Sequence, residues 1–198
     1  MKRKAKKINK GGSRVETSNE VNHKISENEL LYQDDKNESP PLDVFAYNEL
    51  RSCADLYRMY EDDTINIHPG FQREMVWKNP DQTKFIDSLS KELPIPSMCL
   101  SLDANTQKWQ VIDGLQRMST IIRFLGDSQW RMSKLKDIDE RISGKTPGEI
   151  KKKYPNIYKK IQNLTLPITV LRCDYEEPSH REYIFTIFHR LNTGGLRL

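Results

Sequence analysis

The feature that most constrains this chain is a change of hydrophobic pattern at one dipeptide, Asp113-Gly114. Residues 109–112 before it form a β-type run, whereas the apolar residues of 115–125 recur at helical spacing. Another β-type run, 98–102, precedes this unit, and we expect the two runs to form a hairpin. The sequence therefore predicts a strand–turn–helix unit in an α/β fold.

The remainder of the chain also alternates between helical and β-type patterns. Helices are expected at 42–60, from the Asn79 N-cap and Pro80, at 146–160 and from Pro178. The last helix is expected to bury Tyr183, Ile184, Ile187, Phe188 and Leu191. Strands are expected at 64–67, 98–103, 108–112 and 166–172. These elements predict a small mixed sheet or partly open barrel wrapped by helices, while the strand order does not follow from the sequence.

The first 41 residues differ from the rest, because nine Lys/Arg and seven Asp/Glu leave little apolar surface to bury. We interpret 1–41 as a disordered polar arm and 42–198 as the folded domain, with Pro40-Pro41 at the boundary. The tip of the arm is basic, with Lys2, Arg3, Lys4, Lys6, Lys7 and Lys10. It can contact phosphates, serve as a localisation signal or simply solubilise the chain.

Several classes of protein are disfavoured by what the sequence lacks. It has no GxGxxG, Walker A, HExxH or GxSxG motif, and no nuclease motif of the His-Asn-His type. No apolar run is long enough to span a membrane, and no apolar segment follows the basic N-terminus as in a signal peptide. Cys53, Cys99 and Cys173 form no CxxC pair. We therefore expect a cytoplasmic protein with three reduced, mostly buried thiols and no membrane partner.

Residues 113–117, Asp-Gly-Leu-Gln-Arg, carry the clearest chemical signal. Free backbone N–H groups at the start of a helix bind phosphate, and Gly114 permits close approach of a ligand. Arg117 can hold phosphate oxygens, Gln116 can donate and accept hydrogen bonds, and Asp113 can hold Mg²⁺ or orient a water molecule. The alternative is that Asp113-Gly114 is only a turn and Arg117 only a surface residue.

Two further segments have both a functional and a structural interpretation. Gln72-Arg73 lies in an aromatic and apolar loop, 69–77, which is either a binding loop or one anchored to the core with Arg73 solvated. Segment 131–162 carries ten Lys/Arg against four Asp/Glu and begins its helical part with a capping box at Thr146. Its lysines either bind nucleic acid or form a solvated face; they are Lys151, Lys152, Lys153, Lys159 and Lys160.

An ordered set of motifs supports a resemblance to a known family. FQREMVW, FIDSL, PIP, VIDGLQRMSTI and IFHRLNTGG follow one another over about residues 44–198. This set resembles the N-terminal domain of GmrSD-type restriction endonucleases, which looks like a branch of the ParB/sulfiredoxin-like fold. The resemblance implies binding and hydrolysis of a nucleoside triphosphate, with Mg²⁺, by a DGQQR-type box in a defence system that acts on modified phage DNA.

Carried over by resemblance, the box gives Asp113, Gln116 and Arg117 catalytic roles, with Asp113 also a metal ligand. Nucleotide binding falls to Gln72, Arg73, Gly114 and Arg117. The expected partners are the triphosphate, DNA, and a nuclease or other defence-system subunit. Leu115 stands where the common box has glutamine, which removes one polar contact.

The chain ends soon after Asn192-Thr193-Gly194-Gly195, where family members run on and, in the restriction enzymes, reach an HNH-type nuclease domain. We expect either a natural short form or a fragment without its own nuclease domain, and exposed apolar surface at 184–191 would favour self-association. The leading hypothesis is a nucleotide-hydrolysing sensor domain that regulates restriction. The alternatives are a non-catalytic DNA-binding module and an inactive truncated remnant.

Overall fold

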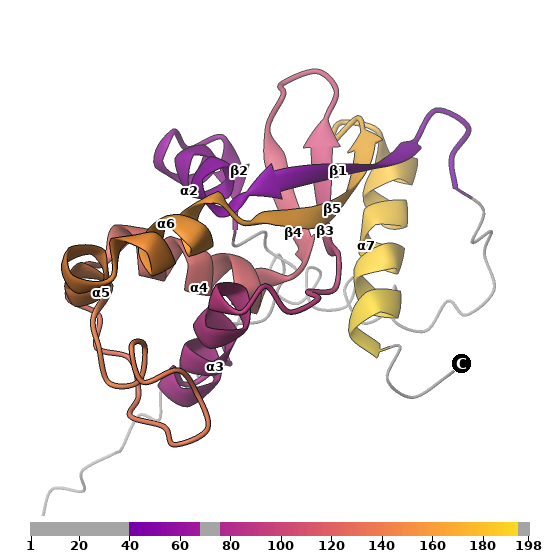
Figure 1. Cartoon of the computed structure of the whole chain (residues 1–198). Helices are drawn as coiled ribbons and strands as arrows, with labels where there is room; N and C mark the ends of the chain where they lie inside the picture. Colours follow the sequence, from indigo (N-terminus) through magenta and orange to yellow (C-terminus); the bar gives the residue numbers. More distant parts are fainter. Residues whose placement is uncertain (1–39, 68–75, 194–198) are drawn as a thin grey trace, which may run out of the picture. The chain divides into compact units, whose positions relative to one another are not determined.

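A five-stranded mixed sheet organises the part of the chain that the computed structural model describes, residues 40–67 and 76–193 (Figure 1). The strands are β1 (Phe45–Ser52), β2 (Ile65–Asn66), β3 (Met98–Asp103), β4 (Trp109–Asp113) and β5 (Thr165–Cys173). The helices are α2 (Cys53–Glu61), α3 (Asn79–Ser90), α4 (Leu115–Gly126), α5 (Pro147–Lys153), α6 (Pro155–Asn163) and α7 (Pro178–Thr193). The predicted α/β class is confirmed, while the predicted arm lies almost entirely outside the described residues.

The strand order is β1-β5-β3-β4-β2. Strands β3 and β4 form the predicted antiparallel hairpin, with Leu100 opposite Val111. Strand β5 runs parallel to β3 and antiparallel to β1, and β2 runs parallel to β4. The hairpin therefore occupies the middle of the sheet, where its strands are paired on both sides.

Both faces of the sheet are covered, which explains the near-continuous apolar runs in its central strands. Because successive residues of a strand point to opposite faces, Val111 belongs to the larger core under α2 to α6, and Ile112 belongs to the smaller core under α7. On β3, Leu100 likewise belongs to the larger core and Cys99 to the smaller one. Helix α7 thus forms a third layer on the face opposite the other helices (Figure 1).

The helix predicted over 42–60 is wrong in its first half. Residues 45–52 form β1, and α2 begins only at Cys53. Ser52 is the N-cap of α2, and its hydroxyl accepts a hydrogen bond from the Asp55 N–H at 3.0 Å. Leu56 and Met59 do follow helical spacing, but Phe45 and Leu50 are five residues apart and lie on a strand.

Most other predicted elements are confirmed with small shifts. The single helix expected at 146–160 is wrong: it is two helices, α5 and α6, because Pro155 breaks the chain after Tyr154. Helix α3 begins at Asn79 with Lys78 as its N-cap, so Asn79 lies one position further into the helix than predicted. The Asn79 side chain instead accepts a hydrogen bond from the Trp130 indole N–H at 2.7 Å. In α7, Ile184 and Phe188 are buried as predicted, whereas Leu191 is 50% exposed.

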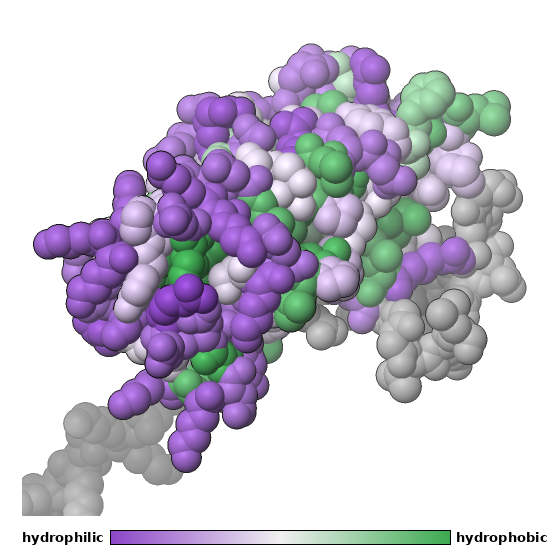
Figure 2. Space-filling view, viewed as in Figure 1, coloured by the Kyte–Doolittle hydropathy of each residue, from purple (hydrophilic) through white to green (hydrophobic). Residues whose placement is uncertain are grey.

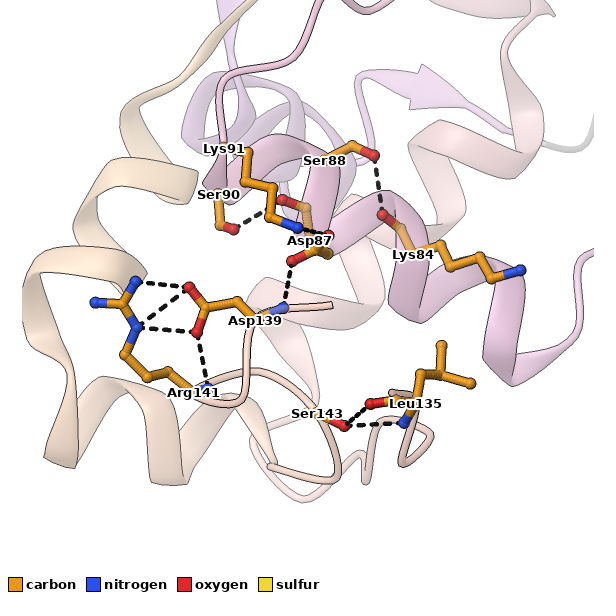
Figure 3. A network of polar contacts seen from close by, with 9 residues as sticks. All are labelled: Lys84, Asp87, Ser88, Ser90, Lys91, Leu135, Asp139, Arg141 and Ser143. Atoms are coloured by element: carbon orange, nitrogen blue, oxygen red, sulfur yellow. Dashed lines mark hydrogen bonds and ion pairs between the residues drawn. The ribbon is translucent and has the colours of Figure 1, made fainter. Parts of the chain in front are cut away.

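A polar network fixes the irregular segment 127–146 to helix α3 (Figure 3). Asp87 is buried and accepts hydrogen bonds from the Asp139 backbone N–H at 2.9 Å and from Lys91 Nζ at 2.6 Å. Arg141 pairs with the Asp139 carboxylate and holds the pKa of Asp139 below its ordinary value. Part of the basic charge predicted for 131–162 is therefore neutralised within the domain.

The three cysteines are free and buried, as predicted. Burial raises the pKa of each thiol to about 12, so Cys53, Cys99 and Cys173 are protonated and poorly nucleophilic at neutral pH. Within the described ranges, no helix combines the length and apolar character that a membrane crossing requires.

Candidate functional site

A cavity of about 360 Å³ opens where β4 ends and α4 begins. Its lining comprises Val76, Trp77, Ile112, Asp113, Gly114, Leu115, Gln116, Arg117, Phe188 and Asn192. The five residues of the predicted box come from the end of β4, Gly114 and the start of α4. Helix α7 supplies Phe188 and Asn192 from the other face of the sheet. The box is therefore a wall of a real cavity and not an isolated surface turn.

The backbone at Gly114 makes the abrupt change from strand to helix. Gly114 has φ of 97°, in the left-handed region that favours glycine, and a register shift in β3 between Cys99 and Leu100 lies opposite the end of β4. Met98 packs against Gly114 so closely that an added Cβ would lie 2.6 Å from its Cγ. A side chain at position 114 thus conflicts with both the backbone conformation and the core.

The N-terminus of α4 has no side-chain cap. The helix ladder begins with the Met118 N–H, which donates to the Gly114 carbonyl at 2.9 Å. The N–H groups of Leu115, Gln116 and Arg117 precede that first bond and so have no carbonyl within the helix to bind. Together with the positive end of the helix dipole, they suit an anion.

Arg117 is held in place by three acceptors. Its Nη2 lies 2.9 Å from Asp113 Oδ2, its Nη1 donates to the Pro96 carbonyl, and Nη2 also reaches the Ser97 carbonyl at 3.5 Å. Burial lowers the pKa of Arg117, and the charge of Asp113 opposes that effect. Of the five guanidinium N–H groups, Nε–H and one Nη1–H have no partner among the described residues.

Gln116 binds the end of the predicted binding loop to α4. Its Oε1 accepts hydrogen bonds from the backbone N–H groups of Val76 at 3.0 Å and Trp77 at 2.9 Å. The Trp77 ring is fixed from another side by an edge-on contact with Phe85, with 5.5 Å between ring centroids. Gln116 therefore positions the aromatic wall of the cavity.

Among the described residues that line the cavity, Asp113 is the one with an acidic side chain. Mg²⁺ is commonly held by one or two carboxylates together with substrate phosphates, and Asp113 has a second oxygen beyond the one that faces Arg117. No cluster of three or more His, Cys, Asp or Glu side chains suited to a metal occurs in the described part of the chain. The donor set fits a Mg²⁺ ion that arrives with phosphates better than one bound by the protein alone.

The structure thus brings four predicted site residues, Asp113, Gly114, Gln116 and Arg117, to one cavity, while their catalytic and binding roles stay predictions. Gln72 and Arg73 lie outside the described residues. Sequence reasoning assigned no role to Asn192 or to the carbonyls that hold Arg117. The motif set already contained both features: Asn192 lies in the NTGG segment, and the Pro96 carbonyl lies in the PIP segment. These two motifs were the signals that could have pointed to them.

The predicted nucleic-acid lysines lie elsewhere, on α5 and α6, at the end of the sheet and helix layers away from α7 (Figure 1). All five are exposed, and that end of the molecule is strongly hydrophilic (Figure 2). Lys160 pairs with Glu92 at 3.2 Å, and Lys151 Nζ lies 5.3 Å from the centroid of the Tyr158 ring. The lysines are divided between two helices, because α5 ends at Lys153 and Pro155 begins α6.

The fold and site together define an α/β domain with a cavity at a strand–helix junction. The family model described as GmrSD restriction endonuclease, N-terminal domain, matches residues 53–198. The chain belongs to this family, as the motifs predicted. No curated protein and no solved structure matched the chain, so the ParB/sulfiredoxin-like assignment stays a prediction.

We predict that Gly114→Ala destabilises the domain more than Gly144→Ala does. Both glycines have positive φ, but a Cβ at 114 meets Met98 at 2.6 Å whereas one at 144 meets nothing closer than 3.6 Å. At position 114 the left-handed backbone and the overpacking together lower the free energy of unfolding by roughly 2–5 kcal/mol. At position 144 the left-handed backbone alone lowers it by about 1–2 kcal/mol. Urea unfolding curves measure both; equal losses would contradict the tight packing of Gly114.

Proposed function

We propose that this domain binds and hydrolyses a nucleoside triphosphate and acts as a sensor that regulates a modification-dependent DNA restriction system. One observation carries the proposal: the uncapped N-terminus of α4 and the guanidinium of Arg117 share one cavity with an aromatic wall. Family membership supports the restriction theme.

The phosphate end of the site comprises α4 and Arg117. Backbone N–H groups of residues 115–117 donate to phosphate oxygens, and the two remaining N–H groups of Arg117 add charge-assisted bonds. Asp113 orients the guanidinium and can place a water molecule for attack. Bound Mg²⁺ would neutralise developing phosphate charge, with Asp113 as its protein ligand.

The base end of the site is apolar. Trp77 and Phe188 offer aromatic surfaces, and Val76 and Ile112 complete the wall. A purine or pyrimidine ring buries apolar area against such side chains and stacks on an aromatic face. Trp77 is held rigidly by Gln116 and Phe85, so little conformational freedom is lost when a base packs against it.

We predict that Arg117→Ala lowers phosphate release at least about 10²-fold, because it removes a preorganised charge next to the reacting phosphate. The assay uses the purified chain with Mg²⁺ and each of ATP, GTP, CTP and UTP, with and without DNA. The control is Arg58→Ala, which removes an exposed arginine on α2 far in sequence from the box.

Phosphate release by the parent chain that persists unchanged in Arg117→Ala would place hydrolysis outside this cavity. Absence of release with all four nucleotides, from chain shown to be folded by circular dichroism, would refute the hydrolytic part of the proposal. Binding measured by isothermal titration calorimetry would then separate a non-hydrolysing nucleotide sensor from a domain that binds no nucleotide.

A second candidate function is DNA binding by α5 and α6. The observation in its favour is that Lys152, Lys153 and Lys159 are exposed. Among the described residues Lys152 and Lys159 form no ion pair, and Lys153 interacts only through its charge with Glu149. Exposed lysines on adjacent helices can neutralise successive phosphates of a duplex without reading its sequence. The two functions are compatible, because the lysines do not line the cavity.

We predict that replacing Lys152 and Lys153 by Ala reduces the salt dependence of DNA affinity. Loss of two phosphate contacts changes the slope of log K against log salt by about 1.8. Fluorescence anisotropy with a labelled duplex over a salt series measures this slope. The double variant Arg58→Ala with Lys84→Ala removes the same charge from exposed positions on α2 and α3, and an equal change in that control would indicate a general charge effect.

A further inference from the structure

The two edges of the sheet differ greatly in length. Strand β2 forms one edge and has only two residues, whereas β1 forms the other and has eight. Strand β1 packs mainly against β5 and, at its C-terminal end, α2. No strand in the described residues pairs with its outer side, so half of its backbone N–H and C=O groups point away from a partner.

Strand β1 carries two charged residues, Glu49 and Arg51, which pair with each other, but it lacks most other features that protect an edge strand. Its sequence, FAYNELRS, contains no Lys and no Pro, and its register with β5 runs without a bulge from Phe45 to Ser52. Apolar side chains are exposed on both faces of the strand: Phe45 and Tyr47 on one, Leu50 on the other. Figure 2 shows hydrophobic surface where the chain leads into β1, at upper right.

We propose that β1 pairs antiparallel with β1 of a second copy of this chain across a two-fold axis at Asn48. The two five-stranded sheets then form one continuous sheet, and both free edges are covered at once. The surface is thus a homodimer interface, separate from the exposed end of α7 around Leu191.

The sequence of the strand is complementary to itself in this pairing. With Asn48 opposite its own copy, Ala46 lies opposite Leu50, Tyr47 opposite Glu49, and Phe45 opposite Arg51. Ala46 and Leu50 meet on one face. On the other face the Tyr47 hydroxyl can donate to the Glu49 carboxylate, and the Phe45 ring meets Arg51, whose guanidinium pairs with Glu49 and lies over Trp109 within each copy. The strand has one Glu and one Arg, and like charges do not meet. This self-complementarity favours a second copy over an unrelated peptide.

Charge substitutions at Asn48 test the pairing, because this exposed residue meets itself at the axis. The parent chain is expected to sediment as a dimer at micromolar concentration in analytical ultracentrifugation. Asn48→Lys and Asn48→Glu, each alone, place like charges opposite one another and lose the dimer. An equimolar mixture of the two variants regains it as a heterodimer. Asn156→Lys, at an exposed position on α6, is the matched control and stays dimeric.

Three outcomes would overturn the proposal. In the first, the parent chain sediments as a monomer over the whole concentration range. In the second, the single variants remain dimeric, which would show that the interface lies on another surface such as α7. In the third, the mixture stays monomeric although both variants unfold cooperatively on heating. The last result would show that the variants lost the dimer for a reason other than charge at the axis.

Discussion

The ion pair between Asp113 and Arg117 is the interaction on which the candidate site depends. It joins the last residue of β4 to the first turn of α4, and the Pro96 and Ser97 carbonyls add the segment that leads into β3. Arg117 is 15% and Asp113 31% exposed, so the pair is partly shielded from water and its charges interact more strongly than on an open surface. The Arg117 guanidinium is therefore held in one orientation by the protein alone.

The strand–turn–helix unit that lines the cavity was predictable from the sequence because its main signal is local. A β-type run, Asp113-Gly114 and a helical stripe occupy adjacent positions, and each has one backbone conformation that suits it. The turn at Asp113-Gly114 and the helix after it follow from these residues alone. The capping box at Thr146 and Glu149 was found for the same reason, since both hydrogen bonds join residues three apart.

Features that depend on distant contacts were not predictable in this way. Strand β1 is stabilised by pairing with β5, about 120 residues later in the chain, and its exposed Phe45 and Leu50 gave a misleading apolar spacing. Phe188 reaches the cavity because α7 covers the face of the sheet to which Ile112 points. No local sequence pattern indicates that α7 packs against β4. The α7 residues that line the cavity were therefore found only from the structure.

The central claim is that the N-terminus of α4 receives the phosphates of a nucleotide. Backbone amide chemical shifts in a ¹⁵N-labelled chain, titrated with Mg²⁺ and a non-hydrolysable triphosphate, test it most directly. The account predicts the largest shifts at Gly114 to Arg117, with smaller ones at Trp77, and little change at Lys152 and Lys159. Large shifts confined to α5 and α6, or none at Gly114 to Arg117 at saturating nucleotide, would contradict it.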